Sequence, residues 1–247
     1  MVDGKPKTVV VTGASRGLGL GIARRLAHAG FNVVGLARTT TEEFTALQTD
    51  PELGARVGFM RADLAQTAEI YTLCRAVQDT HGPIYGLVNN AAVGLDGLLA
   101  TQHERDIDTM LGLNLTAPIL LSKYLSRSML LRRTGRIVNI SSIVANTGFS
   151  GLAVYGATKA ALIGFTRSLA REVAKAGITV NCVCPGYMET AMTEGLDADQ
   201  LNAIRRRSPF GKFVSPGDVA GAVAYLLGEE AAMITGTSIT VDAGSTA

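Results

Sequence analysis

Short, uninterrupted apolar strands alternate with helical stretches along this chain, and no other feature restricts its possible folds as much. Strands are predicted at residues 8–11, 32–37, 57–61, 84–88, 136–140, 178–183 and 238–241. Helical periodicity covers residues 18–29, 67–80, 104–131, 154–176 and 216–227. Strands without polar alternation are typical of a sheet that is covered on both faces. The repeated strand–helix order therefore predicts parallel strands joined by crossover helices.

We expect one α/β domain over residues 1–247, with a doubly wound parallel sheet of about seven strands and helices on both faces. The length fits one large domain, and no linker or low-complexity segment divides the chain. Pro118 lies inside the helical stretch 104–131, so we expect a kink or a break there.

Composition excludes several classes of protein. Hydrophobic residues make up 47% of the chain and the formal net charge is +2, which argues against disorder and against nucleic-acid binding. No uncharged apolar run is long enough to span a membrane, and residues 1–7 lack the layout of a signal peptide. We therefore expect a cytoplasmic protein.

The cysteines and histidines predict no metal site, because the 3 histidines lie far apart without partners at ligand spacing. Cys74, Cys182 and Cys184 are interpreted as small buried hydrophobic residues. Cys182 and Cys184 share a predicted strand with one residue between them, and we expect their side chains to point to opposite faces of the sheet.

A glycine-rich turn, residues 12–19 (TGASRGLG), follows the first predicted strand and leads into the first predicted helix. Glycines let the backbone approach a ligand closely, and a helix N-terminus offers free N–H groups to a phosphate. The spacing differs from the commoner Gly-x-Gly-x-x-Gly pattern. In this position the turn predicts a dinucleotide diphosphate site, with a plain tight turn as the alternative.

The end of the second predicted strand indicates which dinucleotide binds. An acidic residue there would bind the ribose hydroxyls of NAD, but this chain has Ala37 and Arg38. Arg16 in the glycine-rich turn is a second cation within reach of the same place. Two guanidinium groups suit a 2′-phosphate, so we expect NADP(H) as the cofactor. The alternative is that both are solvated surface arginines.

Ser142, Tyr155 and Lys159 follow the fifth predicted strand. Tyr155 and Lys159 are four residues apart, so they share one face of a helix. An ammonium group near a phenol favours the phenolate and lowers the tyrosine pKa, which makes tyrosine a usable acid or base near neutral pH. A serine hydroxyl beside it can hydrogen-bond a carbonyl oxygen. A half-buried helix aromatic and a strand-end cap are the alternative interpretations of Tyr155 and Ser142.

These motifs together resemble the short-chain dehydrogenase/reductase family, nearly from one end of the chain to the other. The resemblance rests on residues 12–19, Asp63-Leu64, Asn89-Asn90-Ala91-Ala92, Asn114, Ser142, Tyr155, Lys159, Pro185-Gly186 and Thr190. Ala92 departs from the pattern, because the family usually has glycine there. The resemblance implies a single-domain, Rossmann-type fold.

The resemblance also implies roles for individual residues. Tyr155 would donate a proton to a carbonyl oxygen, Ser142 would position that oxygen, and Lys159 would hold the nicotinamide ribose and tune Tyr155. Asn114 would support a water relay to Lys159, and the nicotinamide would supply the hydride. The turn, the two arginines and the family motifs together assign these residues to the cofactor: Gly13, Ser15, Arg16, Gly17, Leu18, Gly19, Arg38, Asp63, Leu64, Asn90, Ala91, Ile140, Tyr155, Lys159, Pro185, Gly186, Met188 and Thr190.

Within the family, residues 130–142, 155–185 and 217–244 are most similar to the 3-oxoacyl-(acyl-carrier-protein) reductases of fatty-acid synthesis. This similarity implies NADPH-dependent reduction of a 3-oxoacyl thioester to the 3-hydroxyacyl thioester. The alternative enzyme is an NADP-dependent carbonyl reductase or alcohol dehydrogenase for a hydroxysteroid, a sugar or a small ketone. The alternative that is not an enzyme is a nucleotide-sensing or scaffold protein of the same family.

An acidic carrier protein would need basic residues near the mouth of the site. Arg132, Arg133 and Lys175 are candidates, and residues 205–207 are another, with a solvated helix face as the alternative. Residues 187–212 are interpreted as a mobile lid over the substrate, or else a fixed pair of small helices.

A helix rich in small residues, with Ala157, Ala160, Ala161 and Gly164, matches one that family members pack against a symmetry mate. The resemblance therefore implies a homotetramer with two-fold symmetries. The alternative is that these small residues pack on the sheet of their own chain.

Overall fold

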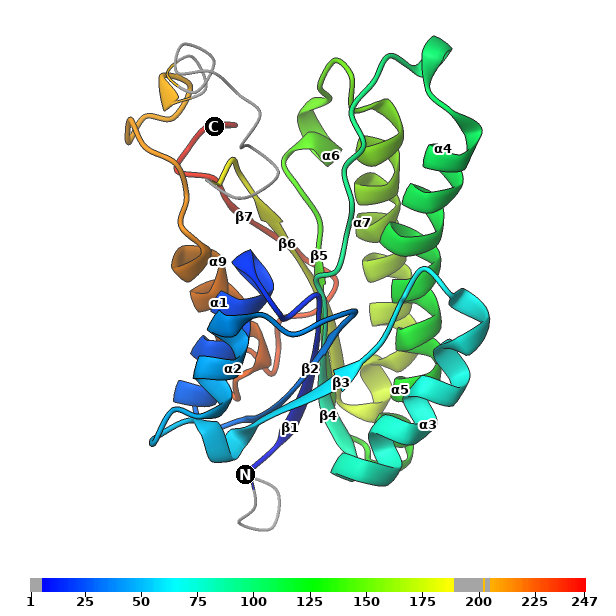
Figure 1. The fold of residues 1–247 in the computed structure, drawn as a ribbon, viewed down its shortest axis with the longest axis vertical. Helices are drawn as coiled ribbons and strands as arrows, with labels where there is room; N and C mark the ends of the chain where they lie inside the picture. The colour runs from blue at the N-terminus through cyan, green and yellow to red at the C-terminus, as the bar shows by residue number, and fades with distance from the viewer. Residues whose placement is uncertain (1–5, 189–201, 203–204) are drawn as a thin grey trace.

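A single parallel sheet organises the molecule. The computed structural model describes residues 6–188, 202 and 205–247. Its strands are β1 (Thr8–Thr12), β2 (Asn32–Ala37), β3 (Val57–Arg61), β4 (Ile84–Asn89), β5 (Gly135–Ile140), β6 (Ile178–Pro185) and β7 (Ser238–Val241). The strand order is β3-β2-β1-β4-β5-β6-β7, and every pairing is parallel. The predicted doubly wound, seven-stranded sheet is confirmed (Figure 1).

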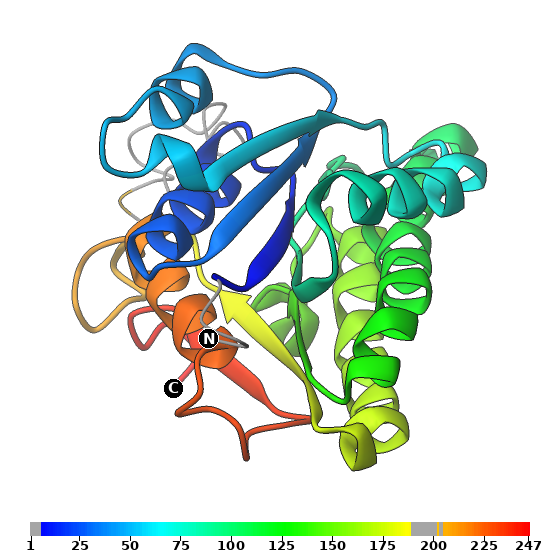
Figure 2. The ribbon, with the colours of Figure 1, turned by 90° about the horizontal axis from the view of Figure 1, so that it is seen from below.

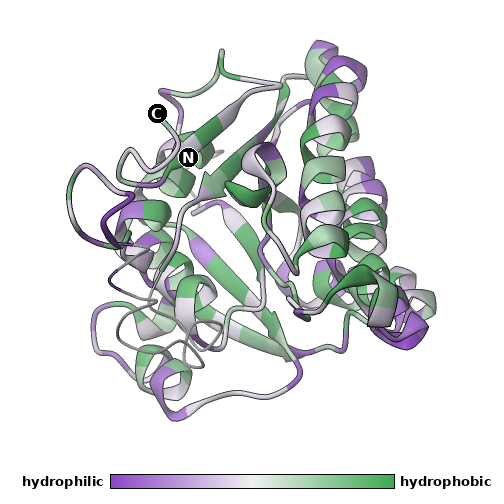
Figure 3. Ribbon diagram, turned by 90° about the horizontal axis from the view of Figure 1, so that it is seen from above, coloured by the Kyte–Doolittle hydropathy of each residue, from purple (hydrophilic) through white to green (hydrophobic). Residues whose placement is uncertain are grey.

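Helices cover both faces of the sheet (Figures 1 and 2). One layer holds α1 (Gly17–His28), α2 (Glu42–Gln48) and α9 (Pro216–Leu227). The other holds α3 (Ile70–His81), α4 (Glu104–Leu111), α5 (Ala117–Arg132) and α7 (Ala153–Val173). The view onto the carboxyl ends of the strands shows a largely hydrophobic sheet between the two layers (Figure 3). Each layer closes its own buried apolar cluster against the sheet.

Two short helices lack a clear sequence signal. The helix α2 begins after Thr41, whose Oγ1 accepts a hydrogen bond from the Phe44 backbone N–H at 3.2 Å. Only Phe44 and Leu47 of this helix are buried, so its apolar periodicity is too short to detect. The second, α6 (Val144–Thr147), is a single turn after β5.

The helical stretch around Pro118 continues without a sharp break. A π-helical turn, η4 (Gly112–Thr116), joins α4 to α5, and Pro118 is the second residue of α5. The irregularity therefore precedes Pro118 rather than lying at it. Proline has no N–H, so Pro118 leaves the carbonyl of Asn114, four residues earlier, without its helical donor.

The cysteines are all buried and free, as predicted. The expectation that Cys182 and Cys184 point to opposite faces was wrong. Side chains alternate along a strand, so residues two apart share a face. Both cysteines pack with Ile163 of α7, and the intervening Val183 belongs to the cluster on the other face.

The small residues of α7 face outward. Ala157, Ala160 and Gly164 are exposed, whereas Leu162 and Ile163 are buried. The alternative that these three residues pack on their own sheet is therefore wrong.

Within the described residues, no helix combines the length and apolarity needed to cross a membrane.

The glycine-rich turn generates a stability prediction. A Cβ at Gly19 would overlap the Gly13 carbonyl and lie 2.7 Å from the Asn90 amide nitrogen. We expect Gly19→Ala to lower the melting temperature by about 3 to 10 °C, because such a contact forces the backbone to shift. Gly221→Ala in α9 is the matched control, since a Cβ there meets nothing within 4 Å. Thermal unfolding should show an unchanged or raised melting temperature for the control. Equal effects of the two substitutions would contradict the proposed close packing.

Candidate active site

The candidate site lies where the carboxyl ends of the strands meet, at the edge seen face-on in Figure 3. Five of the loops there follow β1, β2, β4, β5 and β6. The glycine-rich turn follows β1, Ser142 follows β5, and Gly186 follows β6. The parallel sheet therefore brings the motifs that the sequence singled out to one edge.

The glycine-rich turn uses backbone conformations that suit glycine. Gly13 has φ +64° and Gly17 has φ +55°, both in the left-handed region. The Gly13 N–H donates to the Leu36 carbonyl at 2.7 Å, which fastens the turn to β2. The turn is thus held open in a fixed shape before any ligand arrives.

The N-terminus of α1 has no side-chain cap within the described part of the chain. Arg16 occupies the N-cap position without a side-chain hydrogen bond to the helix, and the first turn contains no acidic residue. The first N–H groups of a helix need acceptors, and a diphosphate supplies them together with negative charge. These residues therefore fit the diphosphate of a dinucleotide.

Arg16 and Arg38 lie at the same corner of the site. Thr41 Oγ1 donates to the Ser15 carbonyl at 2.6 Å, which draws the loop after β2 against the glycine-rich turn. Both arginines are exposed, and within the described residues neither forms an ion pair. They are available to a phosphate group at this corner.

Asp63 and Leu64 follow β3, beside the same corner. Leu64 is buried, while Asp63 is exposed and its Oδ1 accepts from the Ala65 N–H at 3.2 Å. The Ala62 N–H donates to the Ala37 carbonyl at 2.9 Å, so this loop lies next to the end of β2. The position suits contacts to an adenine ring.

A short strap, residues 90–93, runs from the glycine-rich turn to the catalytic residues. Thr12 Oγ1 accepts from the N–H groups of Asn90 and Ala91, both at 2.9 Å. At the other end, Val93 N–H donates to Asn114 Oδ1 and the Val93 carbonyl accepts from Asn114 Nδ2, both at 2.8 Å. Val93 was not among the predicted site residues, and Thr12 was predicted only as the first residue of the glycine-rich turn, because a side chain bonded to backbone leaves no pattern in sequence.

Asn90 supports the turn rather than facing only the ligand. Its Nδ2 donates to the Thr12 carbonyl at 2.8 Å. Sequence analysis assigned Asn90 to the cofactor, and the structure gives its amide this additional structural partner.

Tyr155 and Ser142 are the candidate catalytic pair. Tyr155 lies in the first turn of α7, and Ser142 lies just past the end of β5. The Ser142 hydroxyl lies close enough to the Tyr155 hydroxyl to lower the pKa of Tyr155, and Ser142 Oγ accepts from the Val144 N–H at 3.2 Å. Two hydroxyl groups therefore converge on one point, where they can donate to the same acceptor oxygen.

Lys159 is almost completely buried, with 3% of its surface exposed. Its Nζ donates to the Ile140 carbonyl at 2.8 Å and lies 5.6 Å from the centroid of the Tyr155 ring. Burial lowers the pKa of Lys159 to about 8, while the nearby thiols of Cys182 and Cys184 oppose that shift. The ammonium is thus held inside the protein without a carboxylate partner among the described residues.

The pKa of Tyr155 departs from the sequence prediction. Burial raises the pKa of Tyr155 above its ordinary value, and the hydrogen bond from Ser142 only partly opposes this. The four-residue spacing predicted that Lys159 lowers this pKa. The prediction was wrong for this structure because desolvation is the largest influence on the phenol, and Lys159 is not among the groups that lower its pKa. A raised pKa keeps Tyr155 protonated near neutral pH, as a proton donor must be.

Asn114 lies in the π-helical turn η4 and is buried. Besides its two bonds to Val93, its Nδ2 contacts Thr158 Oγ1 at 3.3 Å, and Thr158 Oγ1 donates to the Tyr155 carbonyl at 2.7 Å. The asparagine therefore ties η4 to the helix that carries Tyr155 and Lys159. Its backbone carbonyl remains without a donor from Pro118.

Beneath these residues, buried amides join β4, β5 and α7. Asn89 Nδ2 donates to Asn139 Oδ1 at 2.8 Å, and Asn139 Nδ2 donates to Thr166 Oγ1 at 2.9 Å. Asn89 was noted only as part of a family motif, and Asn139 and Thr166 were not predicted as site residues. An asparagine inside a predicted strand is the signal that could have indicated this network.

The loop after β6 closes the site on its other side. The Gly186 N–H donates to the Val241 carbonyl at 2.8 Å, and a Cβ on Gly186 would lie 2.7 Å from Asp242 Cα. Glycine is required there for close approach to β7. Met188 packs against the apolar cluster below, whereas Thr190 lies outside the described residues.

The expected carrier-docking residues do not lie near the site. Arg133 precedes β5 and Lys175 follows α7, so both lie at the amino ends of the strands, opposite Ser142. Arg133 donates to the Lys175 carbonyl at 2.7 Å. Arg132 ends α5 at the same edge. The expectation that they line the mouth of the site was wrong for a single chain, because β5 and α7 each run the full height of the sheet.

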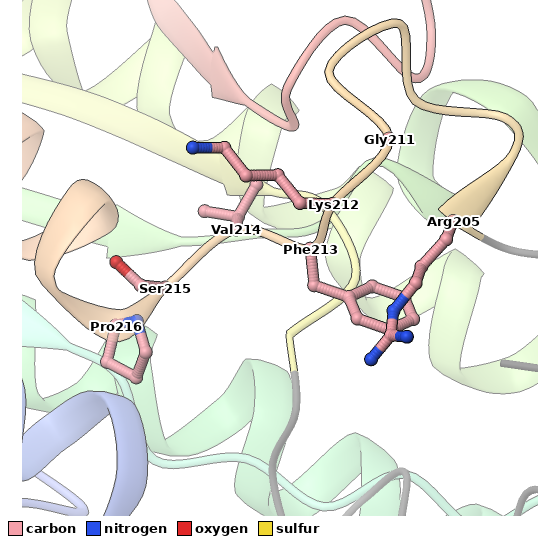
Figure 4. A pocket seen from close by; sticks show the side chains of 7 residues that line it. All are labelled: Arg205, Gly211, Lys212, Phe213, Val214, Ser215 and Pro216. Atoms are coloured by element: carbon pink, nitrogen blue, oxygen red, sulfur yellow. The ribbon is translucent and has the colours of Figure 1, made fainter. Parts of the chain in front are cut away.

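Most of the predicted lid, 187–212, lies outside the described residues. The described end of this segment and the residues just after it line a cavity of about 450 Å³, with Arg205, Gly211, Lys212, Phe213, Val214, Ser215 and Pro216 (Figure 4). The Arg205 guanidinium lies 5.1 Å from the centroid of the Phe213 ring. None of the predicted catalytic residues lines this cavity.

Comparisons with known proteins agree with this geometry. A family model described as Enoyl-(Acyl carrier protein) reductase matches residues 13–246. The 3-oxoacyl-(acyl-carrier-protein) reductase FabG of Vibrio cholerae is 41% identical over 96% of each chain, and nodulation protein G of a Rhizobium species is 43% identical over 96% of each. A crystal structure of a variant of actinorhodin polyketide ketoreductase with NADPH has a TM-score of 0.89, 36% identity and 97% coverage of each chain.

The match spans nearly the whole chain in sequence and in structure, and it agrees with the resemblance of the motifs. The chain belongs to the short-chain dehydrogenase/reductase family, and it is an oxidoreductase acting on C=O and CH–OH groups.

Proposed function

We propose that this protein reduces a 3-oxoacyl thioester, carried by acyl carrier protein, to the 3-hydroxyacyl thioester with NADPH. The observation that carries the proposal is the pair of hydroxyls on Ser142 and Tyr155, which converge beside an uncapped helix N-terminus. The similarity to 3-oxoacyl-(acyl-carrier-protein) reductases supports the class of substrate.

The two hydroxyls favour a carbonyl as the group reduced. The description of the family model names an enoyl reductase, whereas the FabG relatives are named for 3-oxoacyl reduction. A carbonyl oxygen becomes an alkoxide as it accepts a hydride, and two O–H donors stabilise that charge. Ser142 and Tyr155 are placed as such donors.

The residues divide the work as follows. Bound NADPH supplies the hydride. Ser142 orients the carbonyl oxygen, and Tyr155, kept protonated by burial, donates its proton to that oxygen. Lys159 presents its ammonium to the ribose of the cofactor, beside Tyr155. The Asn114 carbonyl, which Pro118 cannot bond, accepts from a water that restores the proton through Lys159.

NADP(H) fits the cofactor corner of the site. The glycine-rich turn and the N-terminus of α1 suit the diphosphate, and Arg16 and Arg38 suit a 2′-phosphate. No acidic residue follows β2 directly, where NAD would need one. The solved relative is described with NADPH, which supports the same preference.

Assembly and location stay predictions. The exposed small residues Ala157, Ala160 and Gly164 of α7 support a face that packs against a second copy, as a homotetramer requires. Within this assembly a carrier protein would approach from the carboxyl edge, where Arg206 and Arg207 are exposed. The similarity to 3-oxoacyl-(acyl-carrier-protein) reductases supports a cytoplasmic enzyme.

The central test is reduction of an acetoacetyl thioester by purified protein, followed as NADPH oxidation. We expect turnover by the wild type and a loss of at least about 100-fold in kcat for Tyr155→Phe, because the proton donor is removed. NADPH binding should persist in the variant. Tyr225→Phe, a half-exposed tyrosine on α9, serves as the control and should retain full activity.

Two outcomes would reject the proposal. If the wild type reduces only a steroid, a sugar or a simple ketone, the alternative carbonyl reductase is correct. If it binds NADPH and reduces none of these compounds, the protein is a nucleotide-binding relative without this activity.

The cofactor corner makes a second prediction. Replacing Arg38 by Ala should raise KM for NADPH about tenfold and leave KM for NADH nearly unchanged, because only NADPH carries the 2′-phosphate. Arg24→Ala, on an exposed part of α1 outside the corner, is the matched control. A wild type that uses NADH as efficiently as NADPH would contradict the assignment.

The pKa of Lys159 predicts a pH dependence. Because burial lowers this pKa to about 8, the ammonium predominates below pH 8 and is lost above it. Affinity for NADPH should therefore fall by up to about tenfold per pH unit above pH 8, as measured by cofactor fluorescence. Lys159→Arg keeps its charge throughout, so its affinity should vary little over the same range. Constant wild-type affinity up to pH 10 would show that the charge of Lys159 does not hold the cofactor.

A further inference from the structure

Tyr187 carries a buried hydroxyl that no described residue satisfies. Its oxygen is inaccessible to solvent and has no hydrogen-bond partner in the described part of the chain. Burial also raises the pKa of Tyr187, so the group is a neutral O–H donor near neutral pH. A buried polar atom without a partner costs free energy, and such atoms are few in native proteins. The Tyr187 hydroxyl can therefore donate a hydrogen bond to a bound ligand.

The backbone places the segment of Tyr187 beside the loop that carries Ser142. Tyr187 directly follows Pro185 and Gly186 at the end of β6. The Ile143 N–H, one residue past Ser142, donates to the Pro185 carbonyl at 3.1 Å. On the other side, the Val214 N–H donates to the Tyr187 carbonyl at 3.1 Å. Tyr187 is therefore fixed at both sides, next to the loop that carries Ser142.

The Tyr187 ring packs on the loop that leads into Tyr155. Its ring and that of Phe149 meet edge to face, with centroids 6.0 Å apart and planes at 63°. Phe149 lies six residues before Tyr155 and is 42% exposed. The phenol of Tyr187 is thus held between the centre of the site and its exposed rim.

Arg207 lies at that exposed rim. The Arg207 guanidinium lies 6.0 Å from the centroid of the Phe149 ring, and Arg207 is exposed. The charged groups that act on the Tyr187 hydroxyl are Arg207, which lowers its pKa, and Asp96, which raises it. A neutral O–H donor next to a guanidinium forms a place for an oxygen acceptor.

We propose that the Tyr187 hydroxyl, supported by Arg207, binds a second oxygen of the substrate and makes the enzyme specific for ketones that carry one. This inference rests on the proposed function. In a 3-oxoacyl thioester the second oxygen is the thioester carbonyl, which one methylene separates from the ketone that is reduced. A simple ketone leaves the buried hydroxyl unpaired, and a site built around a hydrogen bond discriminates strongly against substrates that lack the partner.

The experiment compares three substrates: an acetoacetyl thioester, ethyl acetoacetate and cyclohexanone. The first two have a second carbonyl oxygen at the same spacing, and the third has none. Tyr187→Phe removes one oxygen atom and keeps the ring against Phe149. We expect kcat/KM to fall about tenfold for both dicarbonyl compounds and to change less than about twofold for cyclohexanone. KM for NADPH should stay unchanged.

Matched variants separate this role from general damage. Tyr225→Phe makes the same chemical change on α9, outside the site. It should leave kcat/KM unchanged for all three substrates. Arg207→Gln should reduce kcat/KM for the dicarbonyl compounds about threefold, because the cation beside the acceptor oxygen is removed. Arg75→Gln removes the charge of an exposed arginine on α3 and should have no selective effect.

The outcomes distinguish this inference from the proposed function. A wild type that reduces ethyl acetoacetate but not the thioester rejects the thioester substrate, while the Tyr187 comparison still decides the inference. The inference about Tyr187 is overturned if Tyr187→Phe changes kcat/KM equally for all three substrates, or changes it for none of them. A wild type that prefers cyclohexanone, or reduces no dicarbonyl compound, overturns it as well.

Discussion

The parallel pairing of β4, β5 and β6 is the constraint on which the rest of the site depends. Asn89 pairs with Asn139 and Asn139 with Cys182, so three side chains form one row across the sheet. Beyond the last paired residues, the Ser141 N–H donates to the Val183 carbonyl and carries the pairing on to Ser142. A slip of one residue in any strand would turn its side chains to the other face. The buried amides beneath the site penalise such a slip, because each would lose its partner.

Sequence predicted the strands and the catalytic residues because both are local patterns. Apolar runs identify buried strands, and Tyr155 and Lys159 occupy one helix face at a fixed spacing. What sequence could not predict depends on distant contacts. Asn139 bonds Thr166 from another element, and burial raises the pKa of Tyr155 against the local expectation. Arg133 looked suitable for docking a carrier, but helix length and strand direction place it at the wrong edge.

Lys159 shows how the site trades stability for chemistry. An ammonium group at 3% exposure, bonded to a backbone carbonyl and with no described carboxylate partner, is unfavourable in the folded chain. The lowered pKa of Lys159 reflects the free-energy cost of burying its ammonium group. The folded state accepts it because α7 is anchored elsewhere, through Ser141 Oγ to the Lys159 carbonyl and through Asn139 to Thr166. Buried polar contacts along this helix therefore keep an unfavourable charge beside Tyr155, where the proposed function places the ribose of the cofactor.

The strap of residues 90–93 divides the site into parts that can vary separately. The side chains of Thr12 and Asn114 both hydrogen-bond the backbone of the strap, which ties the glycine-rich turn and η4 into one unit. Arg38 lies outside that unit, just past β2 and on the far side of β1. Under the proposed function, a change of cofactor preference at Arg38 would therefore leave Ser142 and Tyr155 in place. Tyr187 lies outside it too, just past β6, so the substrate specificity proposed for Tyr187 would vary independently of the cofactor corner.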